Sequence, residues 1–138
     1  MPQISIENRI SEILKKICQE KGFLGAIVCT DDGLAIASYA RHQAAEQVEG
    51  KPDEFDLVVS ALGGLFLTVA SRARQELRFK QVEELFLRGE SGLRVTFRVF
   101  QSSFHGNLVL GVLMDHSVPY RRLTSRAIRL VQDAIDSE

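Results

Sequence analysis

The sequence has little of what marks several specialised classes of protein. It contains no tryptophan, two cysteines and three prolines in 138 residues, and its 17 basic and 18 acidic residues nearly cancel. Such a balanced charge argues against a nucleic-acid-binding surface and against an acidic tail. No apolar run approaches the roughly 20 residues that a membrane-spanning helix needs, and the first residues lack the pattern of a secretory signal. We therefore expect no nucleic-acid partner and no membrane span.

The two cysteines, Cys18 and Cys29, stand too far apart in the sequence to form a CxxC redox or zinc motif. Free buried thiols are typical of proteins from reducing compartments. The cysteines therefore predict two buried thiols in a cytoplasmic protein.

Motifs for catalysis and metal binding are also missing. There is no GxSxG elbow, no HExxH and no glycine-rich phosphate loop. Adjacent Asp31 and Asp32 fit a turn better than a metal site, and an enzyme that uses Asp115 with a nearby histidine matches no template. The three histidines show no metal-ligand spacing: His42, His105 and His116. We predict no catalytic residue, no metal and no cofactor.

The first part of the chain predicts a helix followed by a hairpin. Isoleucines and a leucine recur at helical spacing over Ser5–Lys21, with Ser5 as a candidate cap. Two apolar runs, Phe23–Cys29 and Leu34–Tyr39, flank an Asp-Asp-Gly sequence. Asp-Gly between apolar runs favours a tight β-turn, because glycine accepts a positive φ. A polar loop over 40–54 follows.

A long helix is predicted over Glu54–Phe79, and then three strands. The strand Leu93–Phe100 alternates apolar and polar residues, which predicts one solvent-exposed face. Asn107–Met114 is almost continuously apolar, as expected at the centre of a sheet. A last helix spans Pro119–Ile135, with Ser117 as a candidate cap.

The order helix, two strands, helix, three strands, helix predicts one domain over 1–138. Its fold class is α/β, a sandwich built on a five-stranded, mostly antiparallel sheet.

The middle helix is more hydrophobic than one sheet contact requires. Its apolar residues sweep an arc of roughly 180°, whereas a helix that packs on one sheet needs roughly 100°. The other helices of the chain are one possible cover for this surplus. A second subunit is the other, since two-fold dimers are the commonest oligomers, and small residues allow a close approach: Ala61, Gly63, Gly64 and Ala70.

The segment Gly25–Ser38, GAIVCTDDGLAIAS, resembles the first hairpin of the Roadblock/dynein light-chain family. The long Ala/Leu-rich helix and the closing strand Leu108–Leu113 fit the family's order of elements. The loop over 40–54 is longer and more polar than the usual connection, whereas the last helix is similar to that of the longer bacterial members.

The resemblance implies a dimer that pairs through the central helix and the neighbouring strand, and a platform that binds a Ras-like small GTPase as an activating partner or co-regulator. By position, the implied dimer contact comprises Val58, Leu62, Leu65, Phe66, Val69, Leu85 and Leu87. The implied partner platform comprises Ser71, Arg74, Gln75 and Arg78.

Two other functions stay open on the sequence alone. Profilin-like and PAS-like sheets hold small molecules, but such a site needs a cavity with convergent polar groups, and the strands alternate without an evident buried polar residue. A structural scaffold that binds no GTPase is the second alternative.

Overall fold

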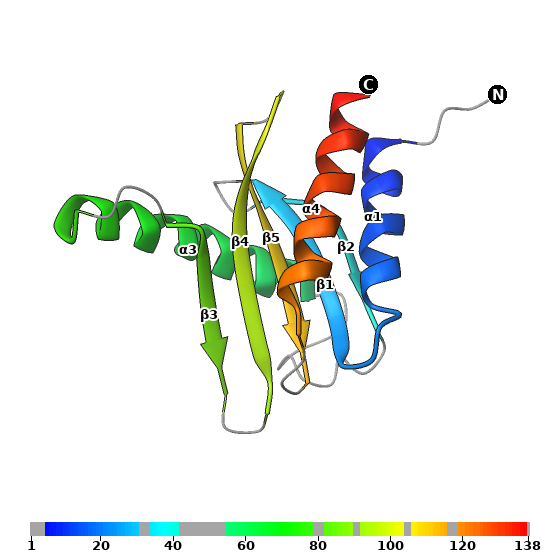
Figure 1. Cartoon of the computed structure of the whole chain (residues 1–138), viewed down its shortest axis with the longest axis horizontal. Coiled ribbons are helices and arrows are strands. Elements are labelled where there is room, and N and C mark those ends of the chain that lie inside the picture. Colours follow the sequence, from blue (N-terminus) through cyan, green and yellow to red (C-terminus); the bar gives the residue numbers. More distant parts are fainter. Residues whose placement is uncertain are drawn as a thin grey trace.

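A computed structural model of the chain describes residues 5–30, 34–41, 55–78, 82–89, 92–103, 106–115 and 119–137, although the side chains of 55–64 and 67 are outside the description. One five-stranded sheet forms the middle layer, with two helices on one face and one on the other (Figure 1). The elements are α1 (Ile6–Ile17), β1 (Phe23–Thr30), β2 (Ala35–Ala40), α3 (Phe55–Glu76), β3 (Glu84–Arg88), β4 (Arg94–Ser102), β5 (Gly106–Met114) and α4 (Arg121–Asp136).

The strand order is β2-β1-β5-β4-β3, and every neighbouring pair is antiparallel. The predicted α/β sandwich is therefore confirmed. The predicted hairpin is present as the β1–β2 pair, which a hydrogen bond from the Thr30 amide to the Leu34 carbonyl closes at 2.8 Å. The turn residues 31–33 and most of the 40–54 loop lie outside the described residues.

The larger hydrophobic core lies between the sheet and the two helices α1 and α4. Ile10 and Leu14 from α1 and Val131 from α4 are fully buried there against Val28 and Leu110. Both helices bury one stripe of apolar residues and expose polar ones, as amphipathic helices on a sheet do. The chain's own two helices thus cover this face of the sheet.

The smaller core lies between the sheet and α3. Phe66 from α3 stacks on Phe97 from β4 with ring centroids 6.4 Å apart. Gly111 on β5 makes room for this pair, because a Cβ there would lie 3.0 Å from the Phe97 ring and 3.1 Å from Ile27.

Three predicted helix limits are wrong, and the local hydrogen bonds show why. α1 ends at Ile17 rather than Lys21, because the next amides bond three residues back and tighten the chain toward Gly22, which has φ 93°. α3 ends at Glu76 rather than Phe79, because Arg78 adopts φ 58°. α4 begins at Arg121 rather than Pro119.

The cap at the start of α4 also differs from the prediction. Tyr120 is the N-cap residue, and its side chain makes no capping hydrogen bond. Ser117, the predicted cap, lies outside the described residues. The N-terminus of α1 does match its prediction, since the Asn8 amide donates to Ser5 Oγ at 3.2 Å.

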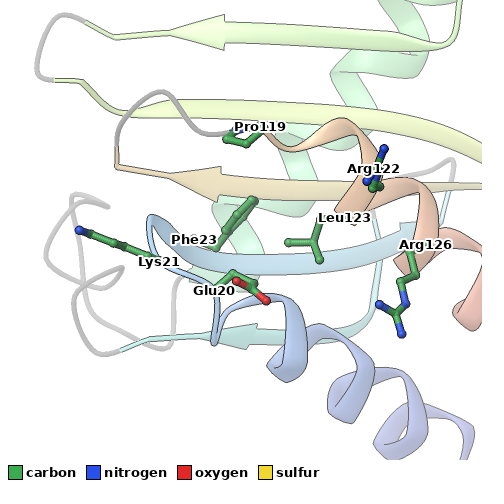
Figure 2. A pocket seen from close by; sticks show the side chains of 7 residues that line it. All are labelled: Glu20, Lys21, Phe23, Pro119, Arg122, Leu123 and Arg126. Carbon is green, nitrogen blue, oxygen red and sulfur yellow. The ribbon is translucent and has the colours of Figure 1, made fainter.

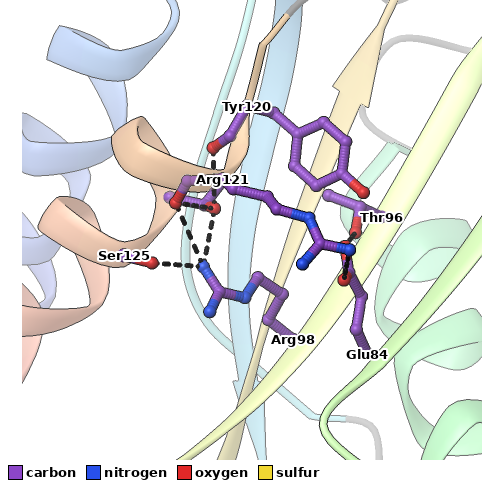
Figure 3. A network of polar contacts seen from close by, with 7 residues as sticks. Glu84, Thr96, Arg98, Tyr120, Arg121 and Ser125 are labelled. Atoms are coloured by element: carbon purple, nitrogen blue, oxygen red, sulfur yellow. Dashed lines mark hydrogen bonds and ion pairs between the residues drawn. The ribbon is translucent and has the colours of Figure 1, made fainter.

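The predicted exposed face of β4 is not exposed. Thr96 is fully buried and Arg98 is half-buried, because α4 covers this side of the strand. The Arg98 guanidinium donates to Thr124 Oγ1 at 2.9 Å and to Ser125 Oγ at 2.7 Å, and Thr96 Oγ1 donates to Glu84 at 2.8 Å (Figure 3). The alternating pattern of β4 therefore belongs to a strand with two covered faces: apolar side chains pack toward α3, and polar side chains form hydrogen bonds on the side of α4.

Cys18 and Cys29 are both buried and neither forms a disulfide, as predicted. Burial raises the pKa of the Cys18 thiol from the usual 9.0 to about 12, against the opposing charge of Arg41. Within the described part of the chain, no helix combines the length and hydrophobicity that a membrane crossing requires.

Candidate protein-interaction surface

The helix α3 lies across one face of the sheet and projects beyond the edge strand β3 (Figure 1). Its sheet-facing stripe starts with Phe66, which is 1% exposed, and Ala70, which is 8% exposed. Ala73 on the same stripe is half-buried, and Leu77 is 64% exposed. Four residues at a spacing of four, three and four share one side of a helix. The stripe therefore becomes exposed where the sheet beneath it ends.

A second group of apolar side chains on α3 faces away from the sheet and is exposed to solvent. Leu65 is 59% exposed and Val69 is 52% exposed, and they are one helical turn apart. We call these two residues the apolar stripe. Val58 and Leu62 have the spacing to continue it toward the start of α3, but their side chains lie outside the described residues.

The strand β3 lies beside the projecting helix at the edge of the sheet. It pairs with β4 from Glu84 to Arg88, and none of the described strands lies on its other side. Leu85 is half-buried against the smaller core, whereas Leu87 is 43% exposed. An edge strand with apolar side chains presents unpaired amides and carbonyls to a second strand.

The described side chains expected at a dimer contact differ in exposure, with Leu85 half-buried between the extremes. Leu65, Val69 and Leu87 are exposed, as a contact surface requires. Phe66 is buried in the protomer's own core on Phe97, so its expected place in the contact is not supported. The 180° arc did not indicate which part of the helix the chain's own sheet would take.

The predicted partner platform lies on a different side of α3. Arg74, Gln75 and Arg78 are exposed and Ser71 is half-buried. At about 100° per residue, Ser71, Arg74 and Gln75 lie away from both the sheet-facing stripe and the apolar stripe, and Arg78 follows the end of the helix. The helix therefore has one side for its own sheet, one apolar exposed side and one polar exposed side.

Charges on the end of α3 are partly paired. Arg72 and Glu76 form an ion pair of 2.7 Å one turn apart, and both side chains are more than half exposed. Such a surface pair contributes at most about 0.5 kcal/mol, so it orients these side chains more than it stabilises the fold. Arg74 and Arg78 have no ion pair with another described residue and leave this end basic.

Among the residues that the structure describes, no three His, Cys, Asp or Glu side chains gather where they could hold a metal ion. The geometry is that of a binding surface: an open strand edge, a projecting helix and exposed leucine and valine side chains.

No protein-family model matches the sequence, and no curated protein matches it either. Solved structures do resemble the fold. The gliding protein MglB from Thermus thermophilus has a TM-score of 0.71 and 15% identity, over 100% of this chain and 96% of that one. The chain has the Roadblock-type fold of the MglB proteins.

Two further structures show the same fold. MglB from Myxococcus xanthus has a TM-score of 0.71 at 12% identity, over 94% of this chain and 96% of that chain. Another MglB structure, described as having a tetrameric arrangement, has a TM-score of 0.71 at 15% identity, over 99% of this chain and 95% of that chain. At these identities the likeness establishes the Roadblock-type fold, which the first hairpin and the order of elements had indicated.

Sequence reasoning did not assign Leu77 to this surface. It also missed that Phe86, which is 40% exposed on β3, faces the opposite side of the sheet, toward the start of α4. Leu77 lies at the helical spacing of the buried stripe, so its exposure depends on where the sheet ends. Phe86 stacks on Tyr120 at 5.9 Å, a contact between residues far apart in the chain that no local pattern predicts.

Proposed function

We propose that this chain is a homodimeric, cytoplasmic protein-interaction module that regulates or scaffolds a Ras-like small GTPase and is not itself an enzyme. The observation that carries the proposal is the exposed apolar surface of α3: Leu65 and Val69 lie on a side that the sheet does not cover, and Leu77 is exposed where the helix projects past the edge strand. Large exposed apolar side chains grouped on one element favour an interface.

A second copy of the chain fits this surface by symmetry. If β3 pairs with β3 of another protomer about a two-fold axis, the two sheets become one, and each projecting helix covers sheet that its own protomer does not provide. The exposed end of the sheet-facing stripe then finds the same kind of surface that Phe66 finds inside the protomer. Burial of Leu77 and Leu87 would contribute roughly 1.5–3 kcal/mol per fully covered side chain.

The polar side of α3 supports the second part of the proposal. In the dimer, Arg74, Gln75 and Arg78 of both copies face away from the sheet and flank the apolar contact. Basic and amide side chains on a rigid helix suit a partner with acidic residues at its switch surface. The Roadblock-type fold of the gliding protein MglB fits a role in GTPase regulation, and the basic helix end suits an acidic partner surface.

The dimer is tested by sedimentation velocity on the wild-type chain, on Leu65→Arg and on Gln75→Arg. Leu65→Arg places a charge in the apolar stripe, where an unpaired buried charge costs several kcal/mol, so we expect a monomer with an intact circular-dichroism spectrum. Gln75→Arg adds the same side chain on the polar side of the same helix, and this variant should remain dimeric. A monomeric wild-type chain, or an unchanged Leu65→Arg dimer, would contradict the proposed contact.

The GTPase is tested with Ras-like GTPases encoded near the gene for this chain, each loaded with GDP or a non-hydrolysable GTP analogue. We expect one of them to co-purify in a nucleotide-dependent way, and Arg74→Glu/Arg78→Glu to weaken that binding while the dimer persists. Arg129→Glu on α4 is the matched charge-reversal control. Absence of binding in both nucleotide states would reject the GTPase assignment and leave the dimer result standing.

A further inference from the structure

A hollow of about 660 Å³ lies on the face of the sheet opposite α3, where the turn after α1 meets the start of α4 (Figure 2). It is separate from the surface described above, because the whole sheet lies between α3 and this site. Its size is that of pockets that take a bound group of several heavy atoms.

The floor of the hollow is apolar. Phe23 at the start of β1 is 3% exposed, and Leu123 on α4 is half-buried. In Figure 2 their side chains lie next to each other between β1 and α4, with Pro119 at one end. Such a floor accommodates one leucine-sized or phenylalanine-sized group.

The rim of the hollow carries three cations and one carboxylate. Lys21 comes from the turn after α1, and Arg122 and Arg126 come from successive turns of α4, whereas Glu20 is the acidic member. Among the described residues, none of the three cations makes an ion pair or a hydrogen bond. The rim is therefore locally positive on a chain whose net charge is -1.

Arg122 lies where its positive charge is electrostatically unfavourable, and a carboxylate from a partner would offset this. It lies in the first turn of α4, which holds no acidic residue and no side-chain cap. A cation there opposes the positive end of the helix dipole. Its neighbour Arg121 lies 3.5 Å from Glu84, but Arg122 has no such carboxylate among the described residues.

We infer that this hollow binds an acidic segment of a partner protein that places one apolar side chain on the floor formed by Phe23 and Leu123 and carboxylates beside Arg122, Arg126 and Lys21. The shape of the site favours a segment over a compact ligand, since five of the seven lining residues are exposed and a small molecule would stay largely in water. An apolar anchor within a polar rim is the usual anatomy of a protein contact. Because α3 lies on the other face, this partner and a GTPase could bind together.

The test uses a panel of fluorescein-labelled peptides in which one leucine, isoleucine, phenylalanine or tryptophan stands between runs of glutamate. Fluorescence anisotropy with the full chain should show binding that weakens with added salt. Replacement of the anchor by serine, or of the glutamates by glutamine, should each abolish it. Amide NMR shifts should change around Phe23 and Leu123.

Charge reversal separates the hollow from general attraction. Arg122→Glu/Arg126→Glu should weaken peptide binding about tenfold or more, because two attractions to the peptide carboxylates become two repulsions. Arg129→Glu, on the same helix outside the lining, should change it by less than about twofold. Thermal melts check that all variants fold.

Two outcomes would overturn the inference: no peptide of the panel binds, or Arg129→Glu weakens binding as much as the double variant. Where every peptide fails, the aromatic anion anilinonaphthalene sulfonate is tested on the same variants, and it would bind the wild type and Arg129→Glu but not Arg122→Glu/Arg126→Glu. Such binding would instead assign the hollow to a small amphiphilic anion.

Discussion

The two faces of the sheet carry the same kind of strands but differ in how the chain covers them. On one face, α1 and α4 together bury a large core, and the side chains of Ile10 and Leu14 are fully enclosed. On the other, a single helix buries Phe66 and leaves Leu65 and Val69 more than half exposed. Both faces are apolar, so the difference lies in what the protomer supplies to cover them.

The difference shows that the exposed apolar residues of α3 do not result from a short or irregular helix. α3 is the longest helix of the described chain, with 22 residues, and it still has apolar residues beyond the reach of its sheet. Since apolar surface that faces water contributes nothing to folding, this surplus favours a partner. On the covered face, the proposed partner site is instead the hollow between the turn after α1 and the start of α4.

The largest expected effect comes from two neighbouring residues on α3. In a chain that carries Val69→Arg, which removes the proposed dimer contact, Phe66→Ala should lower the free energy of unfolding by about 3–5 kcal/mol, because it leaves a cavity against Phe97. Leu65→Ala in the same chain should cost less than about 0.5 kcal/mol. Urea denaturation measures both. Equal losses would show that Leu65 packs within the chain as Phe66 does, and the two faces of the sheet would then be equally covered.

A pH titration examines the covered face. The buried Cys18 thiol has a pKa of about 12 in the folded chain against the usual 9.0, so the folded state keeps its proton longer. The stability from this group is complete below pH 9 and is lost as the pH rises toward 12, at up to about 1.4 kcal/mol per pH unit.

The check compares wild type with Cys18→Ala from neutral pH to about pH 11. We expect the unfolding free energy of the wild type to fall more steeply above about pH 9, so that the two curves converge. Thiol reagents should label Cys18 at neutral pH only at the rate of unfolding. Parallel curves would mean that water reaches the thiol and that this core is less closed than the geometry indicates.

Much of the fold was predictable because its signals are local. The Asp-Asp-Gly sequence between two apolar runs indicated the β1–β2 hairpin, and the continuous apolar run of β5 indicated its central place. The helix ends were not predictable, because they depend on backbone geometry such as φ 58° at Arg78, a residue that gives no sign of a left-handed conformation.

The missed parts of the surfaces depend on contacts between distant residues. Arg98 on β4 bonds Ser125 on α4, which is 27 residues further along, so alternation in β4 alone suggested solvent where α4 lies. On α3, the wide apolar arc correctly indicated a surplus for Leu65 and Val69, but it did not separate them from Phe66. The width of the arc indicates how much apolar surface the helix has, and only the direction in which the sheet lies decides which part of it is buried within the chain.

A smaller effect is expected where the covered face reaches the edge strand. Burial raises the pKa of Glu84, but hydrogen bonds from Tyr120 and Thr96 and the charges of Arg121 and Arg98 outweigh it, and the net pKa is lowered (Figure 3). Thr96→Val keeps the shape and removes one donor, so we expect a loss of about 1–2 kcal/mol at neutral pH.

The sign of its pH dependence distinguishes this bond from packing. A lowered carboxyl pKa stabilises the fold above the usual value of 4.5, and that stability is lost as the pH falls through the folded value. The deficit of Thr96→Val should therefore shrink in urea denaturation below about pH 4.5. A deficit that stays constant at every pH would assign the effect to packing of the Thr96 methyl group and not to Glu84.

The smallest effect concerns Arg78, where stability and function should move in opposite directions. Its φ of 58° is a left-handed conformation that costs an ordinary residue roughly 1 kcal/mol, and glycine adopts it freely. Arg78→Gly should raise the unfolding free energy by up to about 0.5 kcal/mol, after glycine's extra freedom in the unfolded chain is subtracted. It should also weaken binding of the GTPase, because a cation of the proposed platform is removed. Arg78→Ala removes the same cation without the backbone relief, so it should weaken binding equally and leave the chain no more stable. If Arg78→Gly stabilises the chain and binds the GTPase as well as wild type, Arg78 only ends the helix, and the platform must lie elsewhere on α3.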